Sequence, residues 1–296
     1  MDYSERTPSY LKAPIALVIG CGDMGMACAR ALGRRAPLLI VDIDSDRLDQ
    51  SVATLRREGH AVTSLCCDIS DIDDIGDLAA HLATTGTGVR ALAHVAAVGN
   101  PPGGWRTVMQ VDLIGAHLVA RAVARHMVPG GVAVLISSTG SYQCPVDPAL
   151  DALIDAPLKP DFLECLVATL GREPELLEAY FIAKQGVNRL ARRLAIDWGP
   201  RDVRAVSVSP GLIDSTMGRT SGRSLPVNDG QTAKAEATRS EKAAREVPLG
   251  RQGSVLEVMA VVDFLASDAA SFISGIDLPV DGGSTALRRS RGTIAR

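Results

Sequence analysis

The sequence is poor in aromatic residues and lacks the patterns that mark metal sites and membrane-spanning segments. Phenylalanine, tryptophan and tyrosine together make up 3% of its 296 residues. The six cysteines form no Cys-x-x-Cys pair and the five histidines no His-Glu-x-x-His pattern, so we predict no metal site. No apolar run approaches the roughly 18 residues that span a bilayer, and the N-terminal stretch is polar. We therefore expect neither export nor a membrane partner, and the cysteine pattern favours a reduced, cytoplasmic setting.

The chain also lacks a strong charge of either sign. It carries 31 Lys and Arg against 34 Asp and Glu, a net charge of −3, which argues against the basic footprint that nucleic-acid binding requires. The only dense basic run, "LRRSRGTIAR" at 287–296, is predicted to be a solvated tail. Hydrophobic residues make up 46% of the chain, so it can bury a sizeable core of an ordinary globular protein.

Short apolar runs alternate with segments of helical spacing. Apolar strands that alternate with helices imply a parallel sheet covered on both faces, so we predict an α/β, doubly wound (Rossmann-type) fold. Strands are predicted at 15–20, 37–44, 61–70, 89–99, 131–141, 203–211 and 273–283, and helices at 26–35, 71–85, 108–127 and 178–200.

No linker divides this pattern, so a single domain is predicted over 14–285, between a polar extension at 1–13 and a basic tail at 286–296. Two insertions, 142–178 and 214–246, break the alternation. Long insertions of this kind act as lids or substrate-binding elements, or are plain surface excursions. The sequence leaves both interpretations open.

A glycine-rich turn follows the first predicted strand. The letters "GCGDMG" place Gly20, Gly22 and Gly25 at the start of a helix, where bare backbone can approach a pyrophosphate. Asp42 follows at the end of the second strand, near the roughly 20-residue spacing expected of an acid that binds a ribose 2′-hydroxyl. An aspartate there repels a 2′-phosphate, so NAD(H) is favoured over NADP(H). A tight turn before a helix, or the site of an S-adenosylmethionine-dependent methyltransferase, has the same pattern.

The second half of the chain separates these alternatives. Tyr180 and Lys184 lie one helical turn apart in "YFIAK". Tyrosine is a poor base, with an ordinary pKa near 10, but an ammonium on the same helix face stabilises its phenolate. A serine at the end of a neighbouring strand, Ser138 in "ISSTGS", is suited to hold a substrate oxygen. Together these side chains predict proton transfer to or from an alcohol.

At this point the chain resembles the short-chain dehydrogenase/reductase family over nearly its whole length. The resemblance includes the glycine turn, "CDIS", "ISS", "YFIAK", "VSPGLIDS" and the ending "VPLGRQGSVLEVMAVVDFLASDAASFISGIDLPVDGG". It implies that Tyr180 is the acid/base, that Lys184 binds the nicotinamide ribose, that Ser138 positions the substrate and that Asp112 is a fourth catalytic member. The cofactor-binding residues that it implies are Gly20, Gly22, Asp23, Met24, Gly25, Asp42, Ile43, Asp68, Ile69, Ala96, Ala97, Tyr180, Lys184, Pro210, Gly211, Ile213 and Ser215.

Four features depart from the family's usual pattern. Asp23 stands where the glycine turn has its middle glycine, and its carboxylate would repel a pyrophosphate unless it turns outward. The usual "NNAG" is "HVAA" at 94–97, and the asparagine of the family's proton relay is Asp112. Ser138 and Tyr180 are separated by the insertion 142–178. These changes keep open a dinucleotide-binding protein that acts as a sensor or scaffold with little turnover.

The sequence therefore predicts an NAD(H)-dependent oxidoreductase that interconverts a secondary alcohol and a ketone. Apolar residues of the first insertion either cover a hydrophobic, alicyclic or steroid-like alcohol or pack against the body or a neighbouring subunit. The resemblance also implies a homo-oligomer, a tetramer or dimer. The apolar residues in question are Phe162, Leu163, Leu166, Val167, Leu176 and Leu177.

Overall fold

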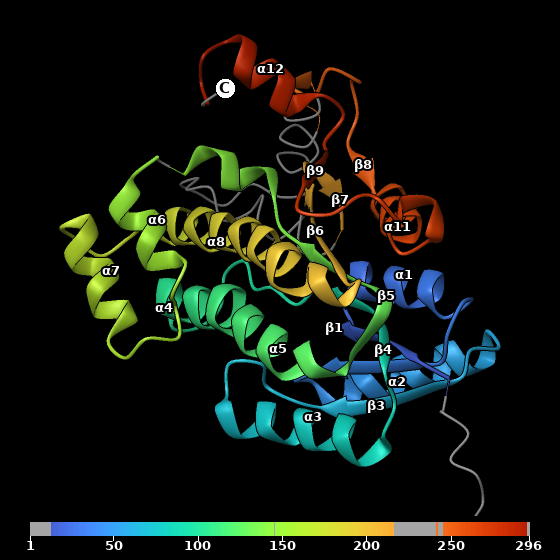
Figure 1. The fold of residues 1–296 in the computed structure, drawn as a ribbon. Helices are drawn as coiled ribbons and strands as arrows, with labels where there is room; N and C mark the ends of the chain where they lie inside the picture. Colours follow the sequence, from blue (N-terminus) through green and yellow to red (C-terminus); the bar gives the residue numbers. More distant parts are fainter. Residues whose placement is uncertain (1–12, 145, 216–240, 242–244, 295–296) are drawn as a thin grey trace, which may run out of the picture.

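Seven short apolar segments pair as parallel strands in the order β3-β2-β1-β4-β5-β6-β9 (Figure 1). The computed structural model describes residues 13–144, 146–215, 241 and 245–294. A separate small pair joins β7 (Ile213–Asp214) to β8 (Gly253–Ser254). The strands of the main sheet are β1 (Ile15–Ile19), β2 (Leu38–Asp42), β3 (Val62–Cys66), β4 (Val89–His94), β5 (Met127–Ile136), β6 (Arg204–Pro210) and β9 (Asp277–Val280).

Helices cover both faces of this sheet, and each face has its own apolar core. On one face lie α3 (Ile72–Thr85), α5 (Ala116–Val123) and α8 (Leu176–Trp198); on the other lie α1 (Asp23–Leu32), α2 (Ser45–Arg57) and α11 (Val255–Leu265). The predicted Rossmann-type fold is therefore confirmed. The alternation of apolar strands and amphipathic helices determined it, since every strand must be covered on both sides.

The strand register brings five strand ends to one edge of the sheet. Ile19 pairs with Val41 on one side and with His94 on the other. His94 in turn pairs with Leu135, and Ile136 with Val208. The segments that follow β1, β2, β4, β5 and β6 therefore emerge side by side. In open α/β sheets ligands bind outside the carboxyl ends of the strands, where the strand order reverses.

The long helix predicted at 108–127 is present but is not uniform. It consists of α4 (Gly104–Val108), a π-helical segment (Met109–Gly115), α5 and a short 3-10 turn (Ala124–His126). The run 104–126 is long and apolar enough to cross a membrane, but 67% of its most apolar window is buried inside the protein. This is the pattern of a core helix. The π segment was not predicted, and it contains Asp112.

The first insertion, for which the sequence predicted no helix or strand, forms helices. After a 3-10 turn (Thr139–Gln143), it contains α6 (Pro148–Ile154) and α7 (Phe162–Leu170), which lie beside the N-terminal half of α8 in Figure 1. Helix α12 (Ser284–Ser290) extends into the predicted basic tail, 286–296. Most of the second insertion, 214–246, lies outside the described residues.

Candidate active site

The glycine turn after β1 is shaped by close backbone contacts. Gly20 has a φ of +96°, and a Cβ there would approach the Ala96 nitrogen to 2.8 Å. A Cβ on Gly25 would lie 1.8 Å from the Gly20 carbonyl oxygen, so only glycine fits at either position. Gly22 instead faces open space at the start of α1. This is a cradle for an anionic group at a helix N-terminus, which fits a dinucleotide pyrophosphate.

Asp23 and Met24 open helix α1 directly after this turn. Asp23 is exposed and Met24 is half-buried. A carboxylate in the first turn of a helix is stabilised by the helix dipole, which accounts for an aspartate at this position. That this carboxylate turns away from a bound pyrophosphate stays a prediction.

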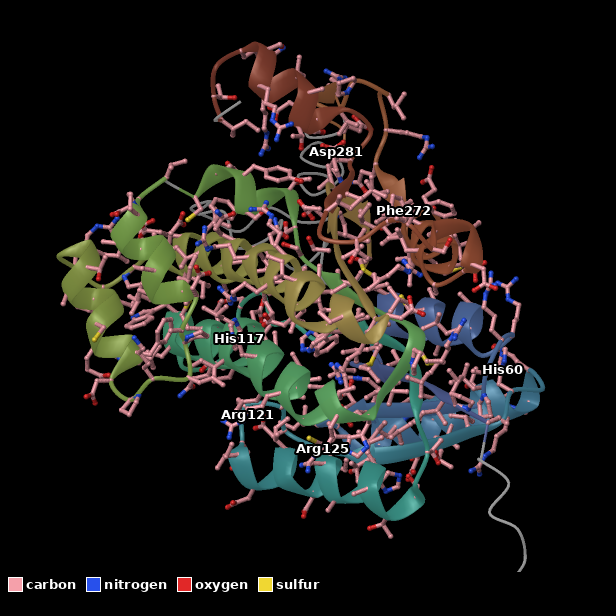
Figure 2. All side chains as sticks on the ribbon, viewed as in Figure 1. His60, His117, Arg121, Arg125, Phe272 and Asp281 are labelled. Atoms are coloured by element: carbon pink, nitrogen blue, oxygen red, sulfur yellow. The ribbon has the colours of Figure 1, made fainter. Side chains whose placement is uncertain are left out.

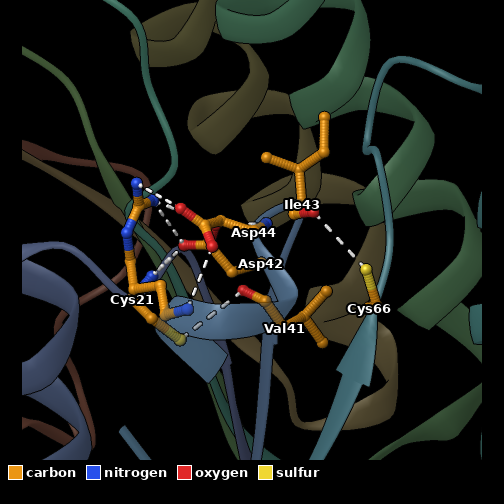
Figure 3. Close-up of polar contacts among 7 residues, drawn as sticks. Cys21, Val41, Asp42, Ile43, Asp44 and Cys66 are labelled. Atoms are coloured by element: carbon orange, nitrogen blue, oxygen red, sulfur yellow. Dashed lines mark hydrogen bonds and ion pairs between the residues drawn. The ribbon is translucent and has the colours of Figure 1, made fainter. Parts of the chain in front are cut away.

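Asp42 is held at the end of β2 by four contacts on its two carboxylate oxygens (Figure 3). The backbone N–H of Cys21 donates to Oδ2 at 2.6 Å, and that of Asp44 donates to Oδ1 at 3.1 Å. Arg47 of α2 contacts both oxygens, at 3.1 and 3.3 Å, and its Nη2 lies 3.1 Å from Asp44 Oδ2. The predicted ribose-binding acid thus has a cationic partner that the sequence analysis missed.

Three predicted cofactor-binding residues follow Asp42. The Ile43 side chain is exposed to solvent, and Asp68 and Ile69 make contacts in the loop that leads into α3. Ile43 is 62% exposed beside the strand ends. Asp68 accepts hydrogen bonds from the backbone N–H and the hydroxyl of Ser70, at 2.9 and 2.6 Å. The Ile69 side chain is buried against Gly115, where a Cβ would come within 2.9 Å of it. Asp68 and Ile69 therefore also have a structural role, which shapes the loop between β3 and α3.

The "HVAA" segment keeps its backbone close to the glycine turn. The N–H groups of Val95 and Ala96 both donate to the Ile19 carbonyl, at 2.9 and 2.8 Å, and Ala97 is half-buried. The His94 side chain is buried, and its Nε2 has no hydrogen-bond partner among the residues that the structure describes. Burial, and secondarily the charge of Lys184, lowers the pKa of His94 to about 3, so the imidazole is neutral.

Asp112 and Lys184 form a buried ion pair. Lys184 Nζ lies 3.2 Å from Asp112 Oδ2, and the two residues are 2% and 0% exposed. Asp112 Oδ1 accepts the backbone N–H of Val98 at 2.8 Å, so one carboxylate fixes both the lysine and the "HVAA" loop. Burial lowers the pKa of Lys184, but the attractions of Asp112 and Tyr180 outweigh it and leave the pKa raised. Lys184 therefore keeps its proton.

The Lys184 ammonium lies on the same face of α8 as Tyr180, with 5.5 Å between Nζ and the centre of the Tyr180 ring. Tyr180 is half-buried and packs against the apolar cluster that the first insertion forms with α4 and α8. The four-residue spacing noticed in the sequence therefore places a phenol beside a buried cation.

Ser138 lies at the end of β5, between two contacts with α8. The hydroxyl of the preceding Ser137 donates to the Lys184 carbonyl at 2.9 Å. Two residues after Ser138, a Cβ on Gly140 would meet the Phe181 ring at 2.6 Å. The Ser138 oxygen accepts the N–H of Gly140 at 3.1 Å, which caps the 3-10 turn. These contacts place the Ser138 turn beside α8, next to Phe181 and Lys184.

The segment after β6 also reaches this edge. Pro210 and Ile213 are buried, the N–H of Gly211 donates to the Val280 carbonyl at 3.0 Å, and Ser215 is buried at the limit of the described chain. A Cβ on Gly211 would lie 2.6 Å from Asp281 Cβ, so glycine is required there. In the described part of the chain no group of three or more His, Cys, Asp and Glu side chains is placed to hold a metal ion.

The first insertion is clamped to α8 by charged side chains. Arg189 contacts Asp155 at 2.5 and 2.7 Å and Asp151 at 2.8 Å, and Arg193 also pairs with Asp155. The His117 ring on α5 lies next to this cluster, 3.4 Å from Arg193 Nη2 (Figure 2). The insertion is therefore an integral part of the fold.

Most apolar side chains of the insertion turn into the body. Phe162 and Leu166 belong to the core that they form with α4 and α8, while Leu163, Val167 and Leu176 are half-buried and Leu177 is half-exposed. For Phe162 and Leu166 this packing favours the second interpretation of the insertion, contact with the body of the protein.

Comparison with known proteins identifies the family. The sequence model of a family described as enoyl-(acyl carrier protein) reductase matches residues 22–148 and 167–285. The unmatched stretch between them contains α6 and the start of α7. Together with the fold, this match shows that the chain belongs to the short-chain dehydrogenase/reductase family, whose members bind a nicotinamide dinucleotide.

Similar proteins extend over almost the whole chain. The cis-4-hydroxycyclohexanecarboxylate dehydrogenase of Sinomonas cyclohexanicum is 27% identical, over 92% of this chain and 97% of its own. The galactitol 2-dehydrogenase (L-tagatose-forming) of Cereibacter sphaeroides is 28% identical, over 96% and 99%. A solved NAD+-bound xylitol dehydrogenase has a TM-score of 0.73 at 22% identity, over 91% and 98% of the two chains, which supports the fold. These relatives are dehydrogenases, and the chain is accordingly an oxidoreductase of this family.

Proposed function

We propose that this protein is an NAD(H)-dependent oxidoreductase that interconverts a secondary alcohol and a ketone. The observation that carries the proposal is the arrangement on α8. Tyr180 lies beside the buried ammonium of Lys184, and the strand end that carries Ser138 is hydrogen-bonded to the Lys184 carbonyl. A phenol, a cation and a hydroxyl in this arrangement are suited to move a proton to or from a substrate oxygen.

The residues present fit a dinucleotide cofactor. Gly20, Gly22 and Gly25 leave bare backbone at the start of α1 for the pyrophosphate, and Asp42 would accept hydrogen bonds from the adenosine ribose. When bound, the nicotinamide supplies or accepts the hydride. The remaining predicted contacts, which stay part of this proposal, are Asp23, Met24, Ile43, Asp68, Ile69, Ala96, Ala97, Pro210, Gly211, Ile213 and Ser215.

The four polar side chains would divide the work as follows. Tyr180 gives a proton to the carbonyl oxygen, or takes one from the alcohol, while the Ser138 hydroxyl donates a hydrogen bond to that oxygen. Lys184 stabilises the phenolate form of Tyr180 through its charge. Asp112 holds the Lys184 ammonium at 3.2 Å and so maintains its orientation. These roles use groups at the carboxyl end of β5, in the π-helical segment and on α8.

A cyclic, largely apolar secondary alcohol is the substrate class that we propose. Val98, Trp105 and Cys144 are partly buried and pack against the same apolar cluster as Tyr180, which favours an apolar substrate. One relative acts on a hydroxycyclohexane carboxylate. Another acts on a polyol, so acyclic polyols are the competing class.

The test begins with titration of the purified protein with NADH and NADPH, read by fluorescence and by thermal stability. We expect tighter binding of NADH, and then turnover of cyclic secondary alcohols in preference to polyols. Tyr180→Phe should lower kcat by at least about a thousandfold, because acid/base catalysis and orientation are both lost. The Kd for NADH should remain within about twofold of the unaltered protein, because the variant keeps the aromatic ring and leaves Lys184, Asp42 and the glycine turn unaltered.

The outcomes separate the proposal from its rival. Cofactor binding without turnover of any alcohol would favour the sensor or scaffold interpretation. Turnover that survives Tyr180→Phe would refute the acid/base role of Tyr180. Equal affinity for NADH and NADPH would refute the cofactor preference. The methyltransferase alternative is ruled out by the family to which the chain belongs.

The homo-oligomer and the cytoplasmic location remain predictions. Phe272, beside α11, is fully exposed (Figure 2), and a neighbouring subunit would cover it if the proposed homo-oligomer pairs through this face. Light scattering of the purified protein distinguishes monomer, dimer and tetramer.

A further inference from the structure

Asp277, the first residue of β9, lies at the centre of a hydrogen-bond network that the catalytic roles above do not use. Its carboxylate accepts the hydroxyl of Ser207 at 2.8 Å and that of Ser209 at 2.9 Å. Both serines are on β6, which pairs with β9, and both are fully buried. The carboxylate is therefore anchored to the sheet.

Two further donors reach the same carboxylate from the elements that carry the proposed catalytic residues. The Tyr142 hydroxyl, in the 3-10 turn that Ser138 caps, donates to Asp277 Oδ2. Asn188 Nδ2, on α8, donates to the same oxygen at 3.2 Å and to the Ser141 hydroxyl at 2.9 Å. Asp277 thus joins the serine turn to α8 and both to the sheet.

The positions on α8 make this connection relevant to the site. Tyr180, Lys184 and Asn188 are spaced four residues apart, so they lie along one face of the helix. A displacement of the turn along that face would change the distance between Ser138 and Tyr180. Both groups must meet one substrate oxygen, and misplacement by about 1 Å can cost about a hundredfold in rate.

A carboxylate suits this position because all four neighbours are donors. Its two oxygens offer about four acceptor sites, whereas an amide offers one oxygen and an NH2 group that would face donors. Burial and the negative charge of Asp277 raise the pKa of Tyr142, so the phenol stays protonated and keeps donating.

We propose that Asp277 is a positioning residue, which acts through Tyr142 and Asn188 to hold the Ser138 turn in register with Tyr180 and Lys184. This inference rests on the proposed function of that site. It concerns a part of the molecule that is separate from the glycine turn, so it predicts an effect on kcat with little effect on cofactor binding.

Tyr142→Phe tests the inference with the smallest change, the loss of one hydroxyl. A matched control is Ser274→Ala, which also deletes one hydroxyl beside β6: Ser274 Oγ accepts the Ala205 N–H at 3.2 Å and is not bonded to Asp277. We expect Tyr142→Phe to lower kcat at least about tenfold, with KM and the Kd for NADH within about twofold. Ser274→Ala should leave kcat within about twofold.

Hydrogen exchange of the peptide 138–144 gives a second measurement that needs neither substrate nor cofactor. Tyr142→Phe and Asp277→Asn should speed exchange there at least about fivefold, and Ser274→Ala should not, because only the first two release the turn. If Asp277→Asn does not fold, Tyr142→Phe alone decides the outcome.

Equal behaviour of Tyr142→Phe and Ser274→Ala in both measurements would overturn the inference. If the unaltered protein turns over no alcohol, the proposed function fails. The exchange experiment then still decides whether Asp277 holds the turn, and unchanged exchange in Tyr142→Phe would overturn that claim. The two failures are therefore distinguishable.

Discussion

Asp112 and Lys184 place two opposite charges where no water reaches them. Taking a single charge out of water costs several kcal/mol, and the pair is tolerated because each charge compensates the other. Asp112 also holds the Val98 N–H, a contact that does not require its charge. Asp112 therefore has two roles: it neutralises the Lys184 charge, and it accepts the hydrogen bond of the Val98 N–H. Substitutions of Asp112 can separate these two roles.

Asp112→Leu should lower the free energy of unfolding by about 3–5 kcal/mol, because it leaves Lys184 buried without a partner. Asp112→Asn should lower the free energy of unfolding by less, because the amide oxygen of the asparagine can still accept the Val98 N–H. The double variant Asp112→Leu with Lys184→Met should recover part of the loss. Urea unfolding of the unaltered protein, these three variants and the single variant Lys184→Met measures this. Strictly additive losses of Asp112→Leu and Lys184→Met would contradict the assignment of a coupled ion pair.

We propose that Arg47 adjusts cofactor choice in this protein. Its guanidinium neutralises Asp42 and Asp44 in part and would attract a 2′-phosphate, so it opposes the repulsion that Asp42 exerts. Arg47→Ala should raise the ratio of the NADPH Kd to the NADH Kd about tenfold, or about 1.4 kcal/mol. Asp42→Ala should lower that ratio. Fluorescence titration measures both, and a ratio that Arg47→Ala leaves unchanged would exclude this role.

At the scale of elements, the first insertion is fastened by few strong contacts. Asp155 receives Arg189 and Arg193 from α8, and α6 is only seven residues long, too short to be stable by itself. The charged clamp and the apolar side chains of Phe162 and Leu166 must together keep α6 and α7 in place.

Asp155→Ala should therefore loosen 148–170 before the rest of the fold. We expect limited proteolysis to cut this segment at least about fivefold faster, with little change in the global unfolding midpoint. Asp268→Ala is the matched control, because Asp268 also pairs with an arginine, Arg90 at 3.3 Å, but is almost fully exposed. Surface pairs of that kind contribute about 0–1 kcal/mol. Cleavage at equal rates in both variants would mean that apolar packing alone holds the insertion.

At the scale of the whole molecule, buried neutral histidines link stability to pH. Burial lowers the pKa of His94 and of His117 to about 3, against an ordinary value of 6.5. Below pH 6.5 the unfolded chain binds protons that the folded chain excludes, so stability is complete above pH 6.5 and falls as the pH drops towards 3.

His94→Asn should reduce the slope of the free energy of unfolding against pH by about 1.4 kcal/mol per pH unit between pH 6 and pH 4. This slope corresponds to the uptake of one proton on unfolding. Denaturant unfolding over this pH range gives the slopes, and parallel curves for His94→Asn and the unaltered protein would show that His94 is not the group responsible.

Much of the molecule followed from the sequence alone. Local periodicity determined the strands and helices, because an apolar run or a 3.6-residue repeat is a property of neighbouring residues. The same holds for the glycine turn, Asp42 and the pair Tyr180 and Lys184, since each lies within one turn or one helix. Ser138 was suggested by its position at the end of a strand predicted beside that helix, and the resemblance added Asp112.

The tertiary structure decided what depends on contacts between distant segments. Four features join residues whose proximity no local pattern encodes. They are the contact of Arg47 with Asp42, the direct ion pair of Asp112 with Lys184, the π segment around Asp112 and the network of Asp277. The helices of the first insertion were missed for the same reason, because their stability comes from docking on α8. A sequence specifies its local conformation through short-range sterics and hydrogen bonding, whereas charge partners and positioning networks exist only once the chain has folded.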